Sequence, residues 1–69
     1  MKKVIIYDEY IRLCDALKFA GIAETGGIAK LMILDGEVSV NGEPCLQKGK
    51  KLYSGDVFTL EGEDYQIAR

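Results

Sequence analysis

The sequence predicts an α+β domain in which two short helices pack on a small, mostly antiparallel sheet. Three observations lead to this prediction. Apolar residues between positions 13 and 34 follow helical spacing, short β-branched or alternating runs lie on both sides of that region, and Asn41-Gly42 is typical of a tight hairpin turn. With 69 residues, 48% hydrophobic content and one proline, the chain is expected to form a single folded domain over residues 1–69, with no repeat and no linker.

The N-terminal third is expected to contain one strand and one helix. Residues 4–6 form a β-branched run that favours a strand, whereas residues 7–11 are compatible with a loop or with an early helical turn. The first helix is predicted from apolar residues spaced three and four apart, and Gly21 can end it in the left-handed conformation. These apolar residues are Leu13, Ala16, Leu17 and Ala20.

A second helix is predicted over residues 28–34, with Thr25 as its N-cap and Gly36 just after its end. At about 100° per residue, Lys30 is expected nearest Gly26, Ile33 and Leu34, on a solvent-facing side opposite Leu31 and Ile28. One face of the helix pair must cover the sheet, and the other face is left for a partner.

The remaining elements are expected to be strands and turns. Val38 and Val40 alternate with polar residues before the Asn41-Gly42 turn, which is predicted to be of type I′. Residues 43–46 are expected to return as a short edge strand, because Pro44 cannot donate to a ladder. Residues 48–51 are expected to form an exposed connection, and residues 52–53 to lead into a turn at 54–56. Strands are predicted at residues 57–60 and 65–68, joined by a turn at Gly62.

The formal net charge of −2 argues against a protein that coats nucleic acid by bulk positive charge. The distribution of charge is more informative. Residues 48–51, KGKK, carry three cations and no anion, whereas every charged residue from 56 to 64 is acidic. A basic side and an acidic side of the molecule are therefore predicted.

Several classes of protein are not supported. There is no His, and Cys14 and Cys45 are far apart, so no metal site is expected; Cys14 is interpreted as a core residue of the first helix. No apolar run approaches the roughly 20 residues needed to span a bilayer, and the N-terminal segment loses its apolar character at Asp8, which favours the cytosol. No nucleophile elbow or Walker-type loop is present, so neither catalysis, a cofactor nor a small-molecule substrate is expected.

The second helix also offers a candidate anion site at its start. Gly26 and Gly27 leave the first N–H groups open to an anion that approaches along the helix dipole, although tight packing on another element would explain two glycines equally well. Lys30 is interpreted either as a solubilising charge or as a phosphate contact. The lysines at 48–51 are either a solvated surface or, together with Arg12, Lys18 and Lys30, a phosphate-binding surface. The aromatic residues show no paired spacing for base stacking, so recognition by shape and phosphate geometry is favoured.

A spaced set of residues resembles the RNA-binding domain of small-subunit ribosomal protein S-four, the alpha-L motif. The matching positions run without gaps from 12 to 42 and continue at Gly55-Asp56: Arg12, Leu13, Leu17, Gly21, Thr25, Ala29, Ile33, Gly36, Val38, Val40, Asn41 and Gly42. The chain departs from the family pattern at Cys14, where Asp is usual, and at Gly26, where Arg is usual. It most resembles the small stand-alone bacterial members, which are ribosome-associated.

The resemblance implies a non-catalytic bacterial RNA-binding module that docks on structured RNA, with ribosomal RNA or a ribosomal subunit as its partner. For that subgroup it implies RNA contacts at Lys18, Lys30, Lys48 and Lys51. The full set of candidate RNA-binding residues is Arg12, Lys18, Thr25, Gly26, Gly27, Lys30, Asn41, Lys48, Lys50 and Lys51.

Two other functions are considered. A protein-interaction adaptor that keeps the fold but has lost RNA binding would agree with the acidic balance and with the absence of Arg at position 26. A fragment of an RNA-modifying enzyme is disfavoured, because Met1 begins the chain and Arg69 follows a complete final strand.

Overall fold

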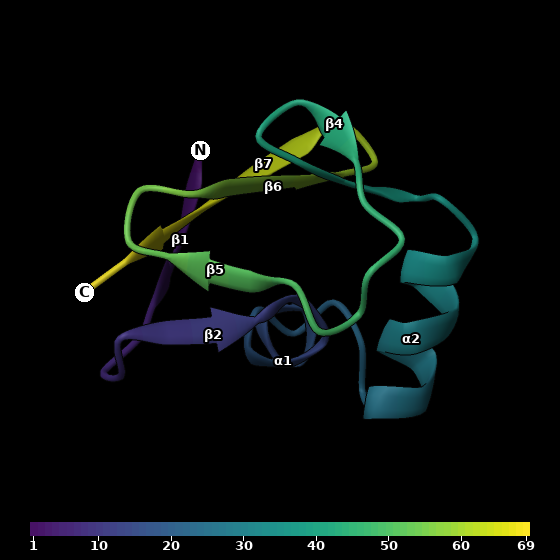
Figure 1. The fold of residues 1–69 in the computed structure, drawn as a ribbon, viewed down its shortest axis with the longest axis horizontal. Coiled ribbons are helices and arrows are strands. Elements are labelled where there is room, and N and C mark those ends of the chain that lie inside the picture. Colours follow the sequence, from purple (N-terminus) through teal and green to yellow (C-terminus); the bar gives the residue numbers. More distant parts are fainter.

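The computed structural model describes residues 1–69 as seven strands and two helices (Figure 1). In chain order the elements are β1 (Lys2–Ile5), β2 (Tyr10–Arg12), α1 (Leu13–Phe19), α2 (Gly26–Leu34), β3 (Val38–Val40), β4 (Glu43–Pro44), β5 (Lys51–Tyr53), β6 (Val57–Leu60) and β7 (Glu63–Ala68).

The strands form two sheets. The larger one has the order β1-β7-β6-β3-β4, in which β1 runs parallel to β7 and all other neighbours are antiparallel. The smaller one is the antiparallel pair β2-β5. Both helices lie on the same side of the larger sheet (Figure 1), so the predicted α+β class with a mostly antiparallel sheet is confirmed.

The helix boundaries follow the predicted caps. Helix α1 ends at Phe19 with Ala20 as its C-cap, and Gly21 follows with φ 78°. At the start of α2, the Thr25 Oγ1 accepts a hydrogen bond of 3.2 Å from the backbone N–H of Ile28, as an N-cap residue does. Gly36, after the end of α2, has φ 79°.

The hairpin at Asn41-Gly42 is also confirmed. Both residues have positive φ, 50° and 87°, and Val40 pairs with Glu43 across them, as in a two-residue type I′ turn. The returning strand β4 lies at the edge of the sheet, as Pro44 requires, but it ends there rather than at residue 46. The chain leaves the sheet after Pro44 because it must reach β5 in the second sheet.

The strands at residues 10–12 and 51–53 correct the sequence interpretation. The sequence is compatible with a loop or a helical turn at residues 7–11 and predicts an exposed connection at Lys51, yet Tyr10–Arg12 and Lys51–Tyr53 are paired strands. A three-residue strand is too short for a period-two pattern to be recognised, and each of these depends on a partner far away in the sequence. The first strand is displaced as well, to Lys2–Ile5 from the predicted 4–6.

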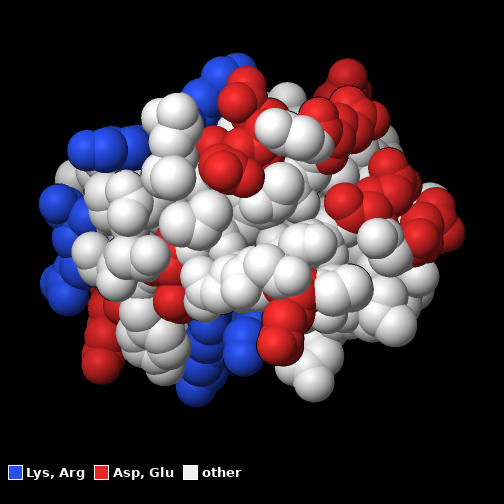
Figure 2. Space-filling view, turned by 90° about the horizontal axis from the view of Figure 1, so that it is seen from above, with Lys and Arg blue, Asp and Glu red and all other residues white.

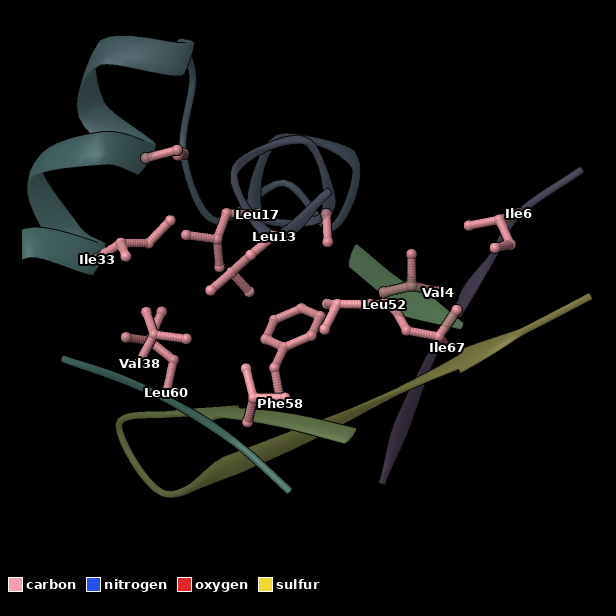
Figure 3. Packing of buried hydrophobic residues seen from close by; sticks show 14 residues of the cluster. Val4, Ile6, Leu13, Leu17, Ile33, Val38, Leu52, Phe58, Leu60 and Ile67 are labelled. Carbon is pink, nitrogen blue, oxygen red and sulfur yellow. The ribbon is translucent and has the colours of Figure 1, made fainter. Parts of the chain in front are cut away.

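The core lies between the helices and the larger sheet. All fourteen buried residues are hydrophobic, and Figure 3 shows Leu13 and Leu17 from α1 pointing toward Phe58 of β6. Phe58 is fully buried and stacks on Tyr65, which is partly buried against the core, with 4.9 Å between ring centroids. Leu52 of β5 is fully buried too, so the small sheet is fixed to the same core. Cys14 is half-buried against this cluster.

Candidate nucleic-acid interface

The basic loop, residues 48–51, is bound to the start of α1. The backbone N–H of Leu13 donates to the Lys50 carbonyl at 2.9 Å, and the N–H of Cys14 donates to the Lys48 carbonyl at 3.0 Å. Arg12 adds a side-chain bond, from Nη1 to the Gly49 carbonyl at 3.3 Å. No side chain caps α1, so the loop carbonyls satisfy its first N–H groups. These bonds fix Arg12 and three lysines at one place, and we call Arg12, Lys48, Lys50 and Lys51 the basic cluster.

The basic cluster is exposed and is not neutralised by acidic side chains. The molecule has two ion pairs, Lys2 with Glu63 and Lys18 with Asp15, each with 3.5 Å between nitrogen and oxygen. No member of the basic cluster has a carboxylate oxygen within the 4.0 Å that defines such a pair. The four cations are therefore free to contact an external anion such as a phosphate group.

The start of α2 is open, as the two glycines suggested. A Cβ atom on Gly26 would meet only the Lys18 Nζ, at 4.0 Å, and one on Gly27 would meet only the Thr25 Oγ1, at 3.8 Å. Neither glycine has a positive φ, so neither tight packing nor backbone conformation requires them. The same contact shows that α1 brings the Lys18 ammonium beside the first residue of α2.

Lys30 is exposed, as predicted, but its neighbours on α2 differ from the helical-wheel expectation. The buried stripe consists of Ala29 and Ile33, so Ile33 points into the core rather than toward the side of Lys30. Ile28 and Leu31, expected on the opposite side, are 41% and 62% exposed. Met32 is partly buried beside this stripe, and the other residues of the helix are exposed to solvent.

Asn41 is engaged within the protein. Its Oδ1 accepts a hydrogen bond of 3.0 Å from the N–H of Val57, and its Nδ2 donates to Asp56 Oδ1 at 3.3 Å. Asp56 Oδ2 in turn accepts from the N–H of Tyr53 at 2.8 Å. The Asn41 side chain thus ties the β3-β4 turn to the turn before β6. These bonds give this candidate residue a structural role.

Sequence reasoning missed an aromatic pair on the small sheet. The antiparallel register places Tyr10 opposite Tyr53, and their ring centroids are 5.9 Å apart. Lys51 Nζ lies 4.8 Å from the centroid of the Tyr10 ring, and the Arg12 guanidinium carbon lies 5.8 Å from it. No local pattern reveals this pair, because it exists only through the pairing of β2 with β5.

The structure therefore brings some of the candidate residues together and leaves others apart. Arg12 joins the lysines of the basic loop, and Lys18 joins Gly26 and Thr25 at the start of α2. In the view from above (Figure 2), most acidic side chains lie toward the right-hand end, and the basic ones lie mainly at the left end and along the upper and lower edges, with some acidic side chains among them. An open groove between the β3-β4 hairpin and the basic loop has Asn41 and Lys50 among its lining residues.

No group of three or more His, Cys, Asp or Glu side chains is placed to hold a metal ion. Neither helix has the length and apolar character that crossing a membrane requires.

These features define a small α+β module with a cationic surface over its first helix, and comparison with known proteins gives its family. The S4 domain model matches residues 4–68, and the chain therefore belongs to the S4 domain family. This agrees with the resemblance at residues 12–42, and the fold is that of the alpha-L motif.

Bacterial relatives cover most of the chain. It is 44% identical over 59 residues to a protein of Bacillus subtilis (strain 168) named "Probable ribosome maturation protein RlbA", covering 86% of this chain and 83% of the relative. It is 34% identical over 58 residues to YbcJ of Escherichia coli (strain K12), covering 84% of this chain and 83% of YbcJ.

Two solved structures share the fold. The solution structure of E. coli YbcJ, described as having an alfaL motif involved in RNA-binding, superposes with a TM-score of 0.75 and 30% identity, covering 100% of this chain and 89% of YbcJ. The 30S ribosomal protein S4e of Thermoplasma acidophilum gives a TM-score of 0.65 at 23% identity, covering 87% of this chain and 32% of that protein. The latter likeness concerns the fold alone.

Proposed function

We propose that this protein is a non-catalytic RNA-binding module that docks on structured ribosomal RNA by contacting phosphate groups, and that it acts in ribosome maturation in the bacterial cytoplasm. The basic cluster is the observation that carries the proposal. Its four cations are exposed and lack carboxylate partners; the backbone of Lys48 and Lys50 is hydrogen-bonded to α1, the Arg12 side chain donates to Gly49, and Lys51 pairs with Arg12 across the small sheet. The name of the B. subtilis relative supports a role at the ribosome, and the description of YbcJ supports RNA as the partner.

The start of α2 offers a second group of phosphate contacts. Its free N–H groups and the positive end of the helix dipole favour an anion, and the two glycines leave the approach open. Lys18 compensates in part for the absence of an arginine at position 26, because its ammonium lies beside Gly26. Its pairing with the exposed Asp15 is too weak to prevent a switch to phosphate.

Salt dependence tests the proposal directly. Binding of ribosomal RNA fragments is measured over a range of salt concentrations for the parent protein, Lys51→Glu and Lys30→Glu. Each phosphate contact that is lost should lower the affinity and reduce the slope of log affinity against log salt by about 0.7–0.9. Co-sedimentation with a ribosomal subunit gives a second measurement.

Lys3→Glu is the matched control. Lys3 is exposed on β1, in the larger sheet, and has no acidic partner, so the change in net charge is identical while the basic cluster is intact. Its affinity should remain close to that of the parent. Equal losses in all three variants would indicate an effect of bulk charge and contradict the proposed interface.

A protein-interaction adaptor is the alternative, and the exposed apolar face of α2 favours it. Ile28, Leu31 and Leu34 are all exposed there, and the net charge of the chain is −2. Binding that is insensitive to salt and equal in the parent and in both charge reversals of the interface would support this function instead.

A further inference from the structure

We infer that the β2-β5 strand pair carries a platform on which an unpaired RNA base stacks, formed by Tyr10 and Tyr53 and bordered by Arg12 and Lys51. The inference rests on the proposed function and adds to it the kind of RNA that is bound. That RNA has an unpaired base next to the stretch of backbone that contacts the basic cluster.

The register of the two strands creates the platform. Tyr10 faces Tyr53 and Arg12 faces Lys51, while Ile11 and Leu52 form the pair between them. Because side chains alternate along a strand, the two tyrosines and two cations share one face and the Ile11-Leu52 pair takes the other. Leu52 is fully buried, which places the tyrosine face on the outside of the molecule.

The core does not explain these two aromatic rings. Neither Tyr10 nor Tyr53 belongs to the buried cluster or to the residues packed against it, whereas Tyr65 packs there by stacking on Phe58. Tyr53 is 44% exposed. The Tyr53 ring is thus exposed on β5, while Leu52 of the same strand is buried on the opposite face. The ring is therefore available to a ligand.

The surrounding cations favour a nucleic-acid base, with its adjoining phosphates, as the ligand of the platform. Lys51 Nζ and the Arg12 guanidinium both lie within 6 Å of the Tyr10 ring centroid, and no cation lies over the ring of Tyr53. Tyr53 therefore keeps a free ring face, next to cations that can hold the adjoining phosphates. Proteins bind unpaired nucleic acid by this combination of an aromatic face and a positively charged border, and sequence-specific recognition of RNA mainly targets unstacked bases in loops and bulges.

Photocrosslinking identifies the residue in contact with the base. Ribosomal RNA transcripts that contain 5-iodouridine are irradiated with the full-length protein, and the crosslinked peptides are sequenced by mass spectrometry. We expect crosslinks at Tyr53 or Tyr10. Crosslinks confined to other residues would overturn the inference while leaving the proposed function intact.

Affinity measurements give an independent test. Two probes are used, an RNA hairpin closed by a loop of uridines and a blunt duplex of the same stem. Tyr53→Leu should weaken binding of the hairpin by about 5- to 150-fold, the equivalent of the 1–3 kcal/mol that stacking contributes per base. It should leave duplex binding unchanged, and Tyr53→Phe should bind both probes like the parent.

Tyr7→Leu is the matched control, because Tyr7 is 86% exposed and has neither a cation nor a second ring beside it. Circular dichroism verifies that each variant is folded. Equal hairpin affinity for the parent and Tyr53→Leu overturns the inference. If Tyr53→Leu binds the hairpin like the parent but is no longer retained on intact ribosomal subunits, the surface binds a ribosomal protein instead. Failure of the parent to bind either probe or any ribosomal RNA fragment overturns the proposed function itself.

Discussion

Substitutions of Asn41 test whether this residue stabilises the fold or contacts RNA. The side chain accepts a hydrogen bond of 3.0 Å from the N–H of Val57 and donates one of 3.3 Å to Asp56, and the residue has φ 50°. Asn41→Ala removes both hydrogen bonds and forces alanine into a left-handed conformation. Asn41→Gly removes the same hydrogen bonds but tolerates the positive φ.

The magnitude follows from these contributions. The two hydrogen bonds are exposed and one is long, so together they contribute about 1–2 kcal/mol. The left-handed conformation costs an L-residue about 1–2 kcal/mol, of which asparagine avoids a part. We expect Asn41→Gly to lower the free energy of unfolding by about 1–2 kcal/mol and Asn41→Ala by about 2–3 kcal/mol. A domain of this size has only about 3–10 kcal/mol in total.

Urea denaturation followed by circular dichroism measures both values, and thermal unfolding should show a decrease in Tm of about 10–20 °C for Asn41→Ala. RNA binding is then measured at a temperature where Asn41→Gly is fully folded, and its affinity should equal that of the parent. Two results would refute the reasoning. If the two variants are equally destabilised, the backbone argument is wrong, and if folded Asn41→Gly binds RNA tenfold more weakly, Asn41 contacts the RNA.

Three further predictions concern the second helix and the core. Gly26→Arg should fit without a clash, because a Cβ atom there meets only the Lys18 Nζ at 4.0 Å. The added arginine should raise the affinity for RNA and steepen the slope of log affinity against log salt by about 0.7–0.9. An unchanged slope would show that no phosphate lies beside position 26. Thr25→Ala removes the N-cap and should lower the free energy of unfolding, measured by urea denaturation, by about 1 kcal/mol, whereas Thr25→Ser should lower it much less. Equal decreases in the two variants would contradict a role for the hydroxyl group. Phe58→Ala should lower the free energy of unfolding by about 3–5 kcal/mol, so that circular dichroism at 37 °C shows a largely unfolded chain. A variant that is folded and unfolds cooperatively would contradict the burial of Phe58 in the core.

The acidic net charge does not conflict with RNA binding, because the position of the cations decides the local potential. Four cations lie over the start of α1 without acidic partners, and Figure 2 shows that acidic side chains are most numerous toward one end of the molecule. Phosphate contacts depend on local charges within about 8 Å at physiological salt, since charges farther away are screened. A small acidic protein can therefore present a local surface that binds RNA.

The sequence by itself determined the elements whose signals are local. Gly21 and Gly36 have the positive φ expected after each helix, Thr25 caps α2, and Asn41-Gly42 forms the predicted turn, because each of these conformations depends on a few neighbouring residues. Helical spacing likewise identified Leu13, Ala16 and Leu17 as the buried face of α1. The family resemblance depended on the same positions.

Only the tertiary structure decided which contacts form between segments that are far apart in the sequence. The pairing of β2 with β5 made residues 10–12 and 51–53 strands, placed Tyr10 opposite Tyr53 and put Arg12 beside the lysines of the basic loop. It was also the packing of α1 against α2 that brought Lys18 to Gly26 and buried Ile33 instead of leaving it beside Lys30. Local propensity fixes turns and caps because their interactions span three or four residues. The candidate interface is made of contacts between segments far apart in the chain, and these exist only once the hydrophobic core has brought the segments together.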